Sequence, residues 1–227
     1  VTVPALRSRK HNGEKITALT CYDASFAAAL ERAELDIALV GDSLGMVVQG
    51  QDSTLPVTLE QMVYHCKAVA RGLRTPLLIA DMPFMSYRDV PVAMDSATRL
   101  LAEGGAAMVK VEGAGWVVDV IKALAERDVP VCAHLGLTPQ SVHKLGGYRV
   151  QGKLEAQAQQ LLEDAQAVSN AGADLLVLEC VPAELATRIT REVPIPTIGI
   201  GAGAGCDGQI LVVYDLLGLT TARPSSA

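Results

Sequence analysis

Short apolar runs alternate with longer amphipathic segments along almost the whole chain. The runs are rich in Val, Ile and Leu and lie at 16–23, 37–45, 76–81, 108–113, 129–136, 175–180 and 196–203. Runs of this length that end at Gly, Pro or Asp are typical of buried β-strands. A further run at 207–214 fits a strand slightly better than a helix capped by Asp207, although periodicity alone does not separate the two.

The intervening segments carry helix signals. Asp23 can cap a helix over 24–34, and Thr58-Leu-Glu-Gln61 has the pattern of a capping box before a helix that ends near Arg71. Further helices are expected at 91–103, 116–127, 154–170 and 182–193. The polar segment 137–153 holds three glycines and lacks a clear period, so its length makes it a candidate lid.

This alternation of strand and helix predicts parallel pairing with right-handed crossovers. Seven or eight such units in 227 residues favour a closed (β/α)₈ TIM barrel, formed as a single domain over residues 1–227 with an incomplete or irregular last unit. An open doubly wound sheet is the alternative. Its usual G-x-G-x-x-G signature does not follow the first predicted strand.

Ionisable side chains stand where several of these predicted strands end. In a parallel barrel all strand carboxyl ends meet on one face, which would gather Asp23, Asp42, Asp81, Glu112, His134 and Glu179. Lys110 lies two residues before Glu112 and therefore points to the same side of the sheet. The sequence thus predicts a pocket of carboxylates with one lysine and one histidine.

Carboxylates crowded in this way repel one another unless a cation or raised pKa values relieve them. Oxygen ligands without a Cys/His cluster favour Mg²⁺ over Zn²⁺. A metal site with a spare carboxylate indicates enolate chemistry, in which the ion polarises a carbonyl, Lys110 neutralises an acid group and one glutamate removes an α-proton.

Each of these residues also has a purely structural interpretation. Gly-Asp-Ser at 41–43 is ordinary turn chemistry, and Asp23 is expected to be only a helix cap. His134 fits a hydrogen-bonded core histidine as well as a substrate contact, and Lys110 can pair with Glu112 without catalysis. The glycines at 199–205 resemble an anion-binding turn but lack the Lys-Ser/Thr of a phosphate loop.

Composition narrows the class of partner. The net charge of −6 argues against nucleic acid or an anionic membrane, so small-molecule substrates are expected. No apolar run has the length of a membrane span, and the polar, basic opening lacks the core of a signal peptide, which predicts a soluble, cytoplasmic protein. Five cysteines without C-x-x-C spacing indicate reduced thiols rather than a zinc site.

Six long blocks carry a family resemblance. They are GDSLGMVVQGQDSTLPVT (41–58), ADMPFMSY (80–87), MVKVEG (108–113), VPVCAHLGLTPQSV (129–142), LLVLECVP (175–182) and IGIGAGAGCDGQILV (198–212). They closely resemble the 3-methyl-2-oxobutanoate hydroxymethyltransferase, or ketopantoate hydroxymethyltransferase, family. The resemblance implies a (β/α)₈ enzyme of pantothenate synthesis that transfers a hydroxymethyl group from 5,10-methylenetetrahydrofolate to α-ketoisovalerate.

Carried over by position, the resemblance also implies roles for single residues. Asp42 and Asp81 would be magnesium ligands, with Glu112 on the metal directly or through water. Glu179 would be the base that takes the C3 proton. The keto acid would be contacted by Asp42, Ser43, Asp81, Lys110 and His134.

The resemblance further implies a homodecamer in which a C-terminal helix packs on a neighbouring subunit. Because the chain begins on Val1 and ends in a polar tail at Ala227, we expect that helix to be missing. A competing interpretation is a Mg²⁺-dependent lyase or mutase of the phosphoenolpyruvate mutase and isocitrate lyase type. Such enzymes usually carry a reactive cysteine in a mobile loop, and 137–153 contains none. A catalytically silent, ligand-binding barrel is the remaining alternative.

Overall fold

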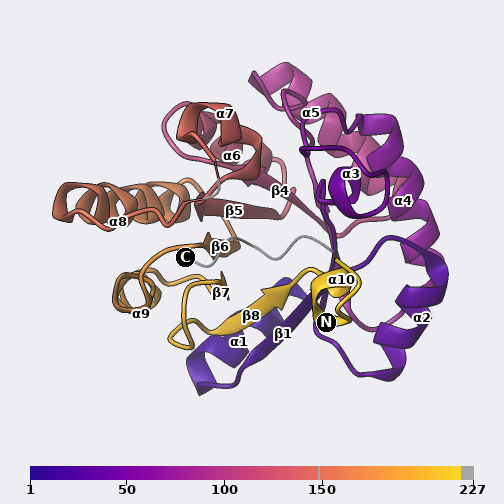
Figure 1. Cartoon of the computed structure of the whole chain (residues 1–227), viewed down its shortest axis with the longest axis horizontal. Coiled ribbons are helices and arrows are strands. Elements are labelled where there is room, and N and C mark those ends of the chain that lie inside the picture. Colours follow the sequence, from indigo (N-terminus) through magenta and orange to yellow (C-terminus); the bar gives the residue numbers. More distant parts are fainter. Residues whose placement is uncertain (148, 221–227) are drawn as a thin grey trace.

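Eight parallel strands close into a barrel, with the helices outside it (Figure 1). The computed structural model describes residues 1–147 and 149–220. The strands are β1 (Ile16–Thr20), β2 (Ile37–Val40), β3 (Leu77–Asp81), β4 (Met108–Glu112), β5 (Val131–Gly136), β6 (Leu175–Glu179), β7 (Thr197–Ile200) and β8 (Gly208–Leu211). β1 pairs with both β2 and β8, which closes the ring. The predicted (β/α)₈ barrel is confirmed, and the run after Asp207 is a strand.

Six helices follow the strands as predicted, with ends that differ by a few residues. They are α2 (Ala24–Arg32), α4 (Leu59–Gly72), α5 (Val90–Thr98), α6 (Val117–Ala125), α8 (Glu155–Asn170) and α9 (Ala183–Glu192). A π-helical turn (Arg99–Glu103) extends α5. The capping box before α4 is confirmed, because the side chains of Thr58 and Gln61 each accept a hydrogen bond from the other's backbone N–H.

Four short helical segments were not predicted. The 3₁₀ turn (Pro139–Ser141) and α7 (Val142–Leu145) lie in the predicted loop 137–153, whereas α3 (Leu44–Val47) and α10 (Val213–Leu216) begin in the last two residues of predicted strand runs. The predicted lid 137–153 is therefore partly helical, and Tyr148 within it lies outside the described residues. In the last repeat the chain passes from β7 to β8 through 201–207, all of them described, without a helix. That irregularity was expected.

The polar N-terminal stretch is a helix, α1 (Val3–Asn12), rather than a tail. The Thr2 side chain caps it, and Leu6, only 1 % exposed, packs against the apolar side chains at the amino-terminal end of the barrel. Basic side chains of α1 form ion pairs with acidic residues at 36, 174 and 207: Arg7–Asp174 at 2.6 Å, Arg9–Asp36 at 2.8 Å and Lys10–Asp207 at 2.9 Å. This helix therefore covers the end of the barrel opposite the predicted site.

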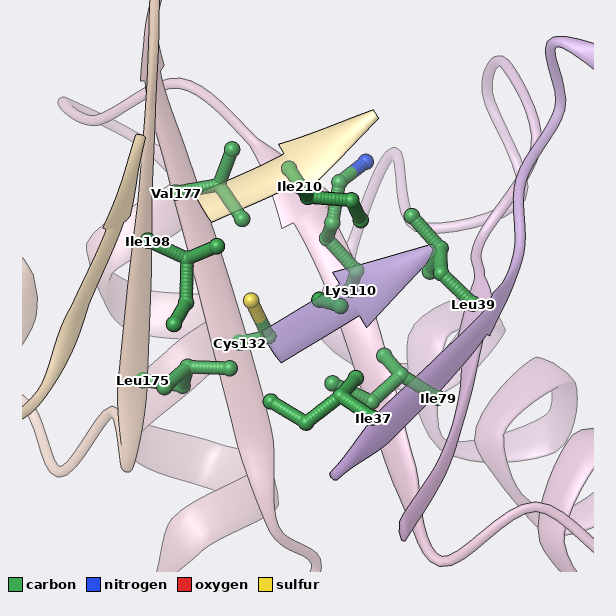
Figure 2. A pocket seen from close by; sticks show the side chains of 10 residues that line it. Ile37, Leu39, Ile79, Lys110, Cys132, Leu175, Val177, Ile198 and Ile210 are labelled. Atoms are coloured by element: carbon green, nitrogen blue, oxygen red, sulfur yellow. The ribbon is translucent and has the colours of Figure 1, made fainter. Parts of the chain in front are cut away.

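Apolar side chains fill the barrel interior. Figure 2 shows them around the stem of Lys110: Ile37, Leu39, Ile79, Cys132, Leu175, Val177, Ile198 and Ile210. The cavity left between them is only about 10 Å³, so the barrel has a packed core rather than a pore. Burial raises the pKa of Cys132 to about 12, which keeps it a neutral thiol. This layer forms the floor of the site.

All five cysteines are free, in agreement with the prediction of reduced thiols. Among the described residues, no helix combines the length and the apolar character that a membrane crossing requires.

Candidate active site

Three carboxylates meet above the apolar floor. Asp42 follows β2, while Asp81 and Glu112 are the last residues of β3 and β4, and each is at most 6 % exposed. Asp81 Oδ2 accepts a hydrogen bond of 3.0 Å from the backbone N–H of Asp42. The convergence expected from strand ends is thus present, because adjacent parallel strands deliver their last residues to the same level.

Lys110 neutralises part of this charge. It is paired in register with Asp81, and its Nζ lies 2.7 Å from Asp81 Oδ1 and 3.8 Å from Glu112 Oε1. Burial lowers the pKa of Lys110, but the nearby carboxylates, Asp81 first, outweigh burial and raise it. Lys110 is therefore an ammonium ion whose main partner here is Asp81, rather than only the Glu112 partner that spacing indicated.

His134 lies between two glutamates. Its Nδ1 is 3.3 Å from Glu112 Oε1, and its Nε2 is 3.2 Å from Glu179 Oε2. Burial and Lys110 lower the pKa of His134, but the two glutamates outweigh both and raise it to about 9. The raised pKa favours the imidazolium form at neutral pH, and His134 links Glu179 to the buried cluster. These contacts agree with both interpretations of the sequence, a hydrogen-bonded core histidine and a substrate contact.

Glu179 differs from the other carboxylates in its access to solvent. Its side chain is 19 % exposed, against 3–4 % for those of Asp81 and Glu112. The end of β5 supports it, since Leu137 N–H donates to the Glu179 carbonyl at 2.8 Å. Gly136 adopts a φ of +93°, and a Cβ there would lie 2.2 Å from that carbonyl oxygen. Only glycine allows this close approach.

The neighbouring charges shift the pKa values of two carboxyl groups in opposite directions. Burial, together with Asp81 and Glu112, raises the pKa of Asp42 well above its ordinary value. Burial also raises the pKa of Glu112, but His134, Lys110 and a backbone N–H outweigh that effect and lower it. Burial and the two neighbouring carboxylates thus favour the neutral form of Asp42.

Two other predicted residues have clear places. The Asp23 carboxylate accepts hydrogen bonds from the backbone N–H groups of Ser25 and Phe26, so Asp23 is the cap of α2, as expected. Ser43 Oγ lies 2.9 Å from the hydroxyl of Tyr22. Burial raises the pKa of Tyr22, which keeps that hydroxyl protonated.

Sequence reasoning missed Tyr22, Tyr87 and Gln140. Gln140 lies in the 3₁₀ turn, is only 7 % exposed and contacts Asp42, Glu112 and Tyr87. Gln140 lies in a polar segment that has no hydrophobic periodicity, so the sequence gave no sign that its side chain is buried. The start of the predicted lid is therefore anchored in the site.

The donor set fits a hard divalent cation. Asp81 Oδ1 and Glu112 Oε1 are buried oxygens that face cationic side chains: Lys110 Nζ lies 2.7 Å from the first and 3.8 Å from the second, and His134 Nδ1 lies 3.3 Å from the second. Four carboxylates gather with two cations, so the site has an excess of negative charge. Within the described chain, no three or more His, Cys, Asp or Glu side chains are placed so that they could together hold a metal ion. Mg²⁺ does not require such a set, because it usually binds one or two carboxylates and completes its octahedron with water and substrate.

These features define the class of protein. A parallel barrel with a packed interior and ionisable residues at its carboxyl-terminal mouth is a TIM-barrel enzyme. Among solved structures, the chain is similar to phosphonopyruvate hydrolase in complex with oxalate and Mg²⁺, with a TM-score of 0.71, 15 % identity and coverage of 95 % of this chain and 83 % of that one. It is also similar to 2,3-dimethylmalate lyase, a member of the phosphoenolpyruvate mutase/isocitrate lyase superfamily, with a TM-score of 0.68, 19 % identity and coverage of 95 % and 82 %. At such identities the likeness concerns the fold alone.

Sequence comparison gives the family. The model of the ketopantoate hydroxymethyltransferase family matches residues 1–226. A relative from Nitrosococcus oceani, named 3-methyl-2-oxobutanoate hydroxymethyltransferase, is 55 % identical over 226 residues, which cover 100 % of this chain and 86 % of the relative. A relative of the same name from Marinobacter nauticus is 58 % identical over 223 residues, or 98 % and 84 % of the two chains. The chain belongs to the ketopantoate hydroxymethyltransferase family, and the resemblance seen in its motifs is confirmed.

Proposed function

We propose that this protein transfers a hydroxymethyl group from 5,10-methylenetetrahydrofolate to 3-methyl-2-oxobutanoate (α-ketoisovalerate) and so forms 2-dehydropantoate. Family membership over the whole chain supports the reaction. The observation that carries the mechanism is the partly exposed Glu179 carboxylate, linked through His134 to a buried carboxylate cluster. This arrangement separates a group that can exchange protons from groups that can hold a metal.

Asp42, Asp81 and Glu112 would hold Mg²⁺, with Glu112 bound directly or through water. When bound, the ion would polarise the keto group of the substrate and stabilise the negative charge that develops on its oxygen. Ser43 and Lys110 would contact the substrate, and the partner of Lys110 would be the carboxylate of the keto acid. The Lys110 ammonium group would then share its contacts between that carboxylate and Asp81, which lies 2.7 Å away.

Glu179 would take the proton from C3 of the keto acid. The C3–H bond breaks, a carboxyl O–H bond forms, and the electron pair moves into the C2–C3 bond as charge develops on the keto oxygen. Glu179 Oε2 faces His134, which leaves Oε1 to accept the proton.

The carbon nucleophile would then attack the one-carbon unit of the folate. Overall, a new C–C bond forms, both bonds between that carbon and the folate nitrogens N5 and N10 break, and water supplies the hydroxyl group. The proton taken from C3 and the second proton of that water end on the two folate nitrogens. Family resemblance alone supports the folate donor. It is likewise the basis on which we propose a single catalytic domain, a homodecamer and a cytoplasmic location.

Proton exchange tests the proposal without folate. The protein is incubated with Mg²⁺ and α-ketoisovalerate in D₂O, and the C3 proton is followed by NMR. We expect exchange that EDTA suppresses and that Glu179→Gln abolishes. Glu184→Gln is the matched control, because Glu184 is an exposed glutamate in the first turn of α9.

Absence of exchange in folded wild-type protein would refute the proposed function. The donor is tested separately by adding methylenetetrahydrofolate and measuring 2-dehydropantoate. If exchange occurs but no product forms, the folate assignment is wrong and the proton-abstraction step survives.

A further inference from the structure

We propose that Gln140 is a positioning residue that fixes which carboxylate oxygens of Asp42 and Glu112 face the metal. This inference rests on the proposed function, because it concerns the same site. Gln140 belongs to the loop after β5, and its contacts reach residues that follow or end β2, β3 and β4. It thereby connects four successive strand ends.

The side-chain amide of Gln140 uses both of its hydrogens. Nε2 donates to Asp42 Oδ2 at 2.8 Å and to the carbonyl oxygen of Met82 at 3.0 Å. Met82 is the residue directly after Asp81, so one amide group holds the Asp42 carboxylate against the backbone beside Asp81. Because Asp42 Oδ2 is engaged, Oδ1 is the oxygen left to face a metal.

The backbone of Gln140 acts on the second carboxylate. Its N–H donates to Glu112 Oε2 at 3.0 Å. The other oxygen, Glu112 Oε1, is buried and faces His134 Nδ1 at 3.3 Å and Lys110 Nζ at 3.8 Å. Gln140 therefore engages one oxygen on each of two proposed ligands and makes no hydrogen bond to the other oxygen of either.

The orientation of the Gln140 amide is determined by its surroundings. Its Oε1 accepts a hydrogen bond of 2.6 Å from the hydroxyl of Tyr87. A flipped amide would place Oε1 against two acceptors, Asp42 Oδ2 and the Met82 carbonyl, so the flip is excluded by chemistry. Tyr87 is 4 % exposed and stacks on Trp116, with ring centroids 5.9 Å apart. Packing thus fixes Tyr87, Tyr87 fixes Gln140, and Gln140 fixes Asp42.

Groups that orient metal ligands in this way typically change metal affinity or activity by about 10- to 100-fold when removed. Gln140→Leu keeps nearly the same volume and the backbone N–H to Glu112, but removes the amide. Tyr87→Phe removes the hydroxyl that orients the amide. Gln151→Leu is the matched control, since Gln151 lies in the same 137–153 segment and its side chain donates to the local carbonyl of Arg149.

The test measures Mg²⁺ dissociation constants by calorimetry, thermal midpoints and the C3-exchange rate as a function of Mg²⁺. We expect Gln140→Leu to weaken Mg²⁺ about 10- to 100-fold in folded protein, and Gln151→Leu to leave the constant unchanged. Tyr87→Phe should weaken Mg²⁺ less, and the double variant should bind no more weakly than Gln140→Leu alone, because both act through one amide. Excess Mg²⁺ should recover most of the exchange rate.

Two results would overturn the inference. One is an unchanged Mg²⁺ constant in folded Gln140→Leu, even if its thermal midpoint falls, because that would show a structural role only. The other is fully additive losses in the double variant. If wild-type protein binds Mg²⁺ and Gln140→Leu weakens it while neither exchanges the C3 proton, the positioning role holds and the proposed function fails.

Discussion

Replacing Lys110 with methionine removes the ammonium ion from a buried cluster of carboxylates. Lys110 is 5 % exposed, and its Nζ lies 2.7 Å from Asp81 Oδ1. At an effective dielectric constant of about 20, two unit charges at that distance attract by about 6 kcal/mol, and desolvation offsets part of this. Breaking a buried pair at one end typically costs about 3–5 kcal/mol. We expect Lys110→Met to lose this much stability in the absence of metal.

The assay is urea unfolding followed by circular dichroism, first in EDTA and then with increasing Mg²⁺. Mg²⁺ should stabilise Lys110→Met more than wild type, because the variant has one more uncompensated negative charge. At a concentration of 100 times its dissociation constant, a ligand adds about 2.7 kcal/mol. Lys122→Met is the control, since Lys122 is 65 % exposed and 4.0 Å from Glu126 on the surface of α6, and it should leave the transition in place.

The pH dependence of Lys110→Met gives a second check. The folded pKa of Asp42 is already raised above its ordinary value, and removing the cation raises it further. A carboxyl group with a raised folded pKa stabilises the fold when protonated and loses that contribution as pH rises, so the variant should regain stability in mild acid. Equal stability of variant and wild type in EDTA, or equal gains from Mg²⁺, would refute the charge balance that we assign to this site.

Three further predictions concern the surroundings of the cluster. In metal-free protein, protonated His134 stabilises the fold fully below its unfolded pKa of about 6.5, and this contribution is lost as the pH rises to its folded pKa of about 9. Urea unfolding should show a loss on the order of 3 kcal/mol across this range in wild type and none in His134→Asn. Leu6→Ala should cost about 2–5 kcal/mol by the same method yet leave Mg²⁺ affinity unchanged, because Leu6 packs at the far end of the barrel. Gly136→Ala forces a Cβ against the Glu179 carbonyl, so it should lower both the thermal midpoint and the C3-exchange rate; wild-type values for both would contradict the close approach.

The sequence was most informative where local pattern and topology agree. Short apolar runs that end in an acid predict buried strands, and a parallel barrel brings their ends together, so Asp42, Asp81 and Glu112 were found without any contact information. Helix α1 was missed because Leu6 is its one buried residue, and many of its other contacts are polar, including ion pairs with carboxylates that are distant in the sequence. A helix with one buried apolar residue has no hydrophobic periodicity by which the sequence could reveal it.

Gln140 shows a different limit of sequence reasoning. Its partners Asp42 and Met82 are 98 and 58 residues away in the chain, so neither spacing nor composition around Gln140 could indicate them. A polar, glycine-containing segment predicts exposure, yet here a glutamine is buried because every polar atom of its side chain finds a partner. Sequence pattern identifies the charged groups of a site more readily than the neutral ones that orient them.

The charge balance of the site links metal binding to folding. Among the described residues, the cationic side chains paired with the carboxylates of the site are Lys110 and His134. Burial, together with Asp81 and Glu112, raises the pKa of Asp42. A bound divalent cation would relieve the repulsion among these carboxylates, and this relief would favour metal binding to the folded protein. Glu179 differs from the three buried carboxylates because its side chain is partly exposed and paired with His134, as the proton exchange that we propose for it requires.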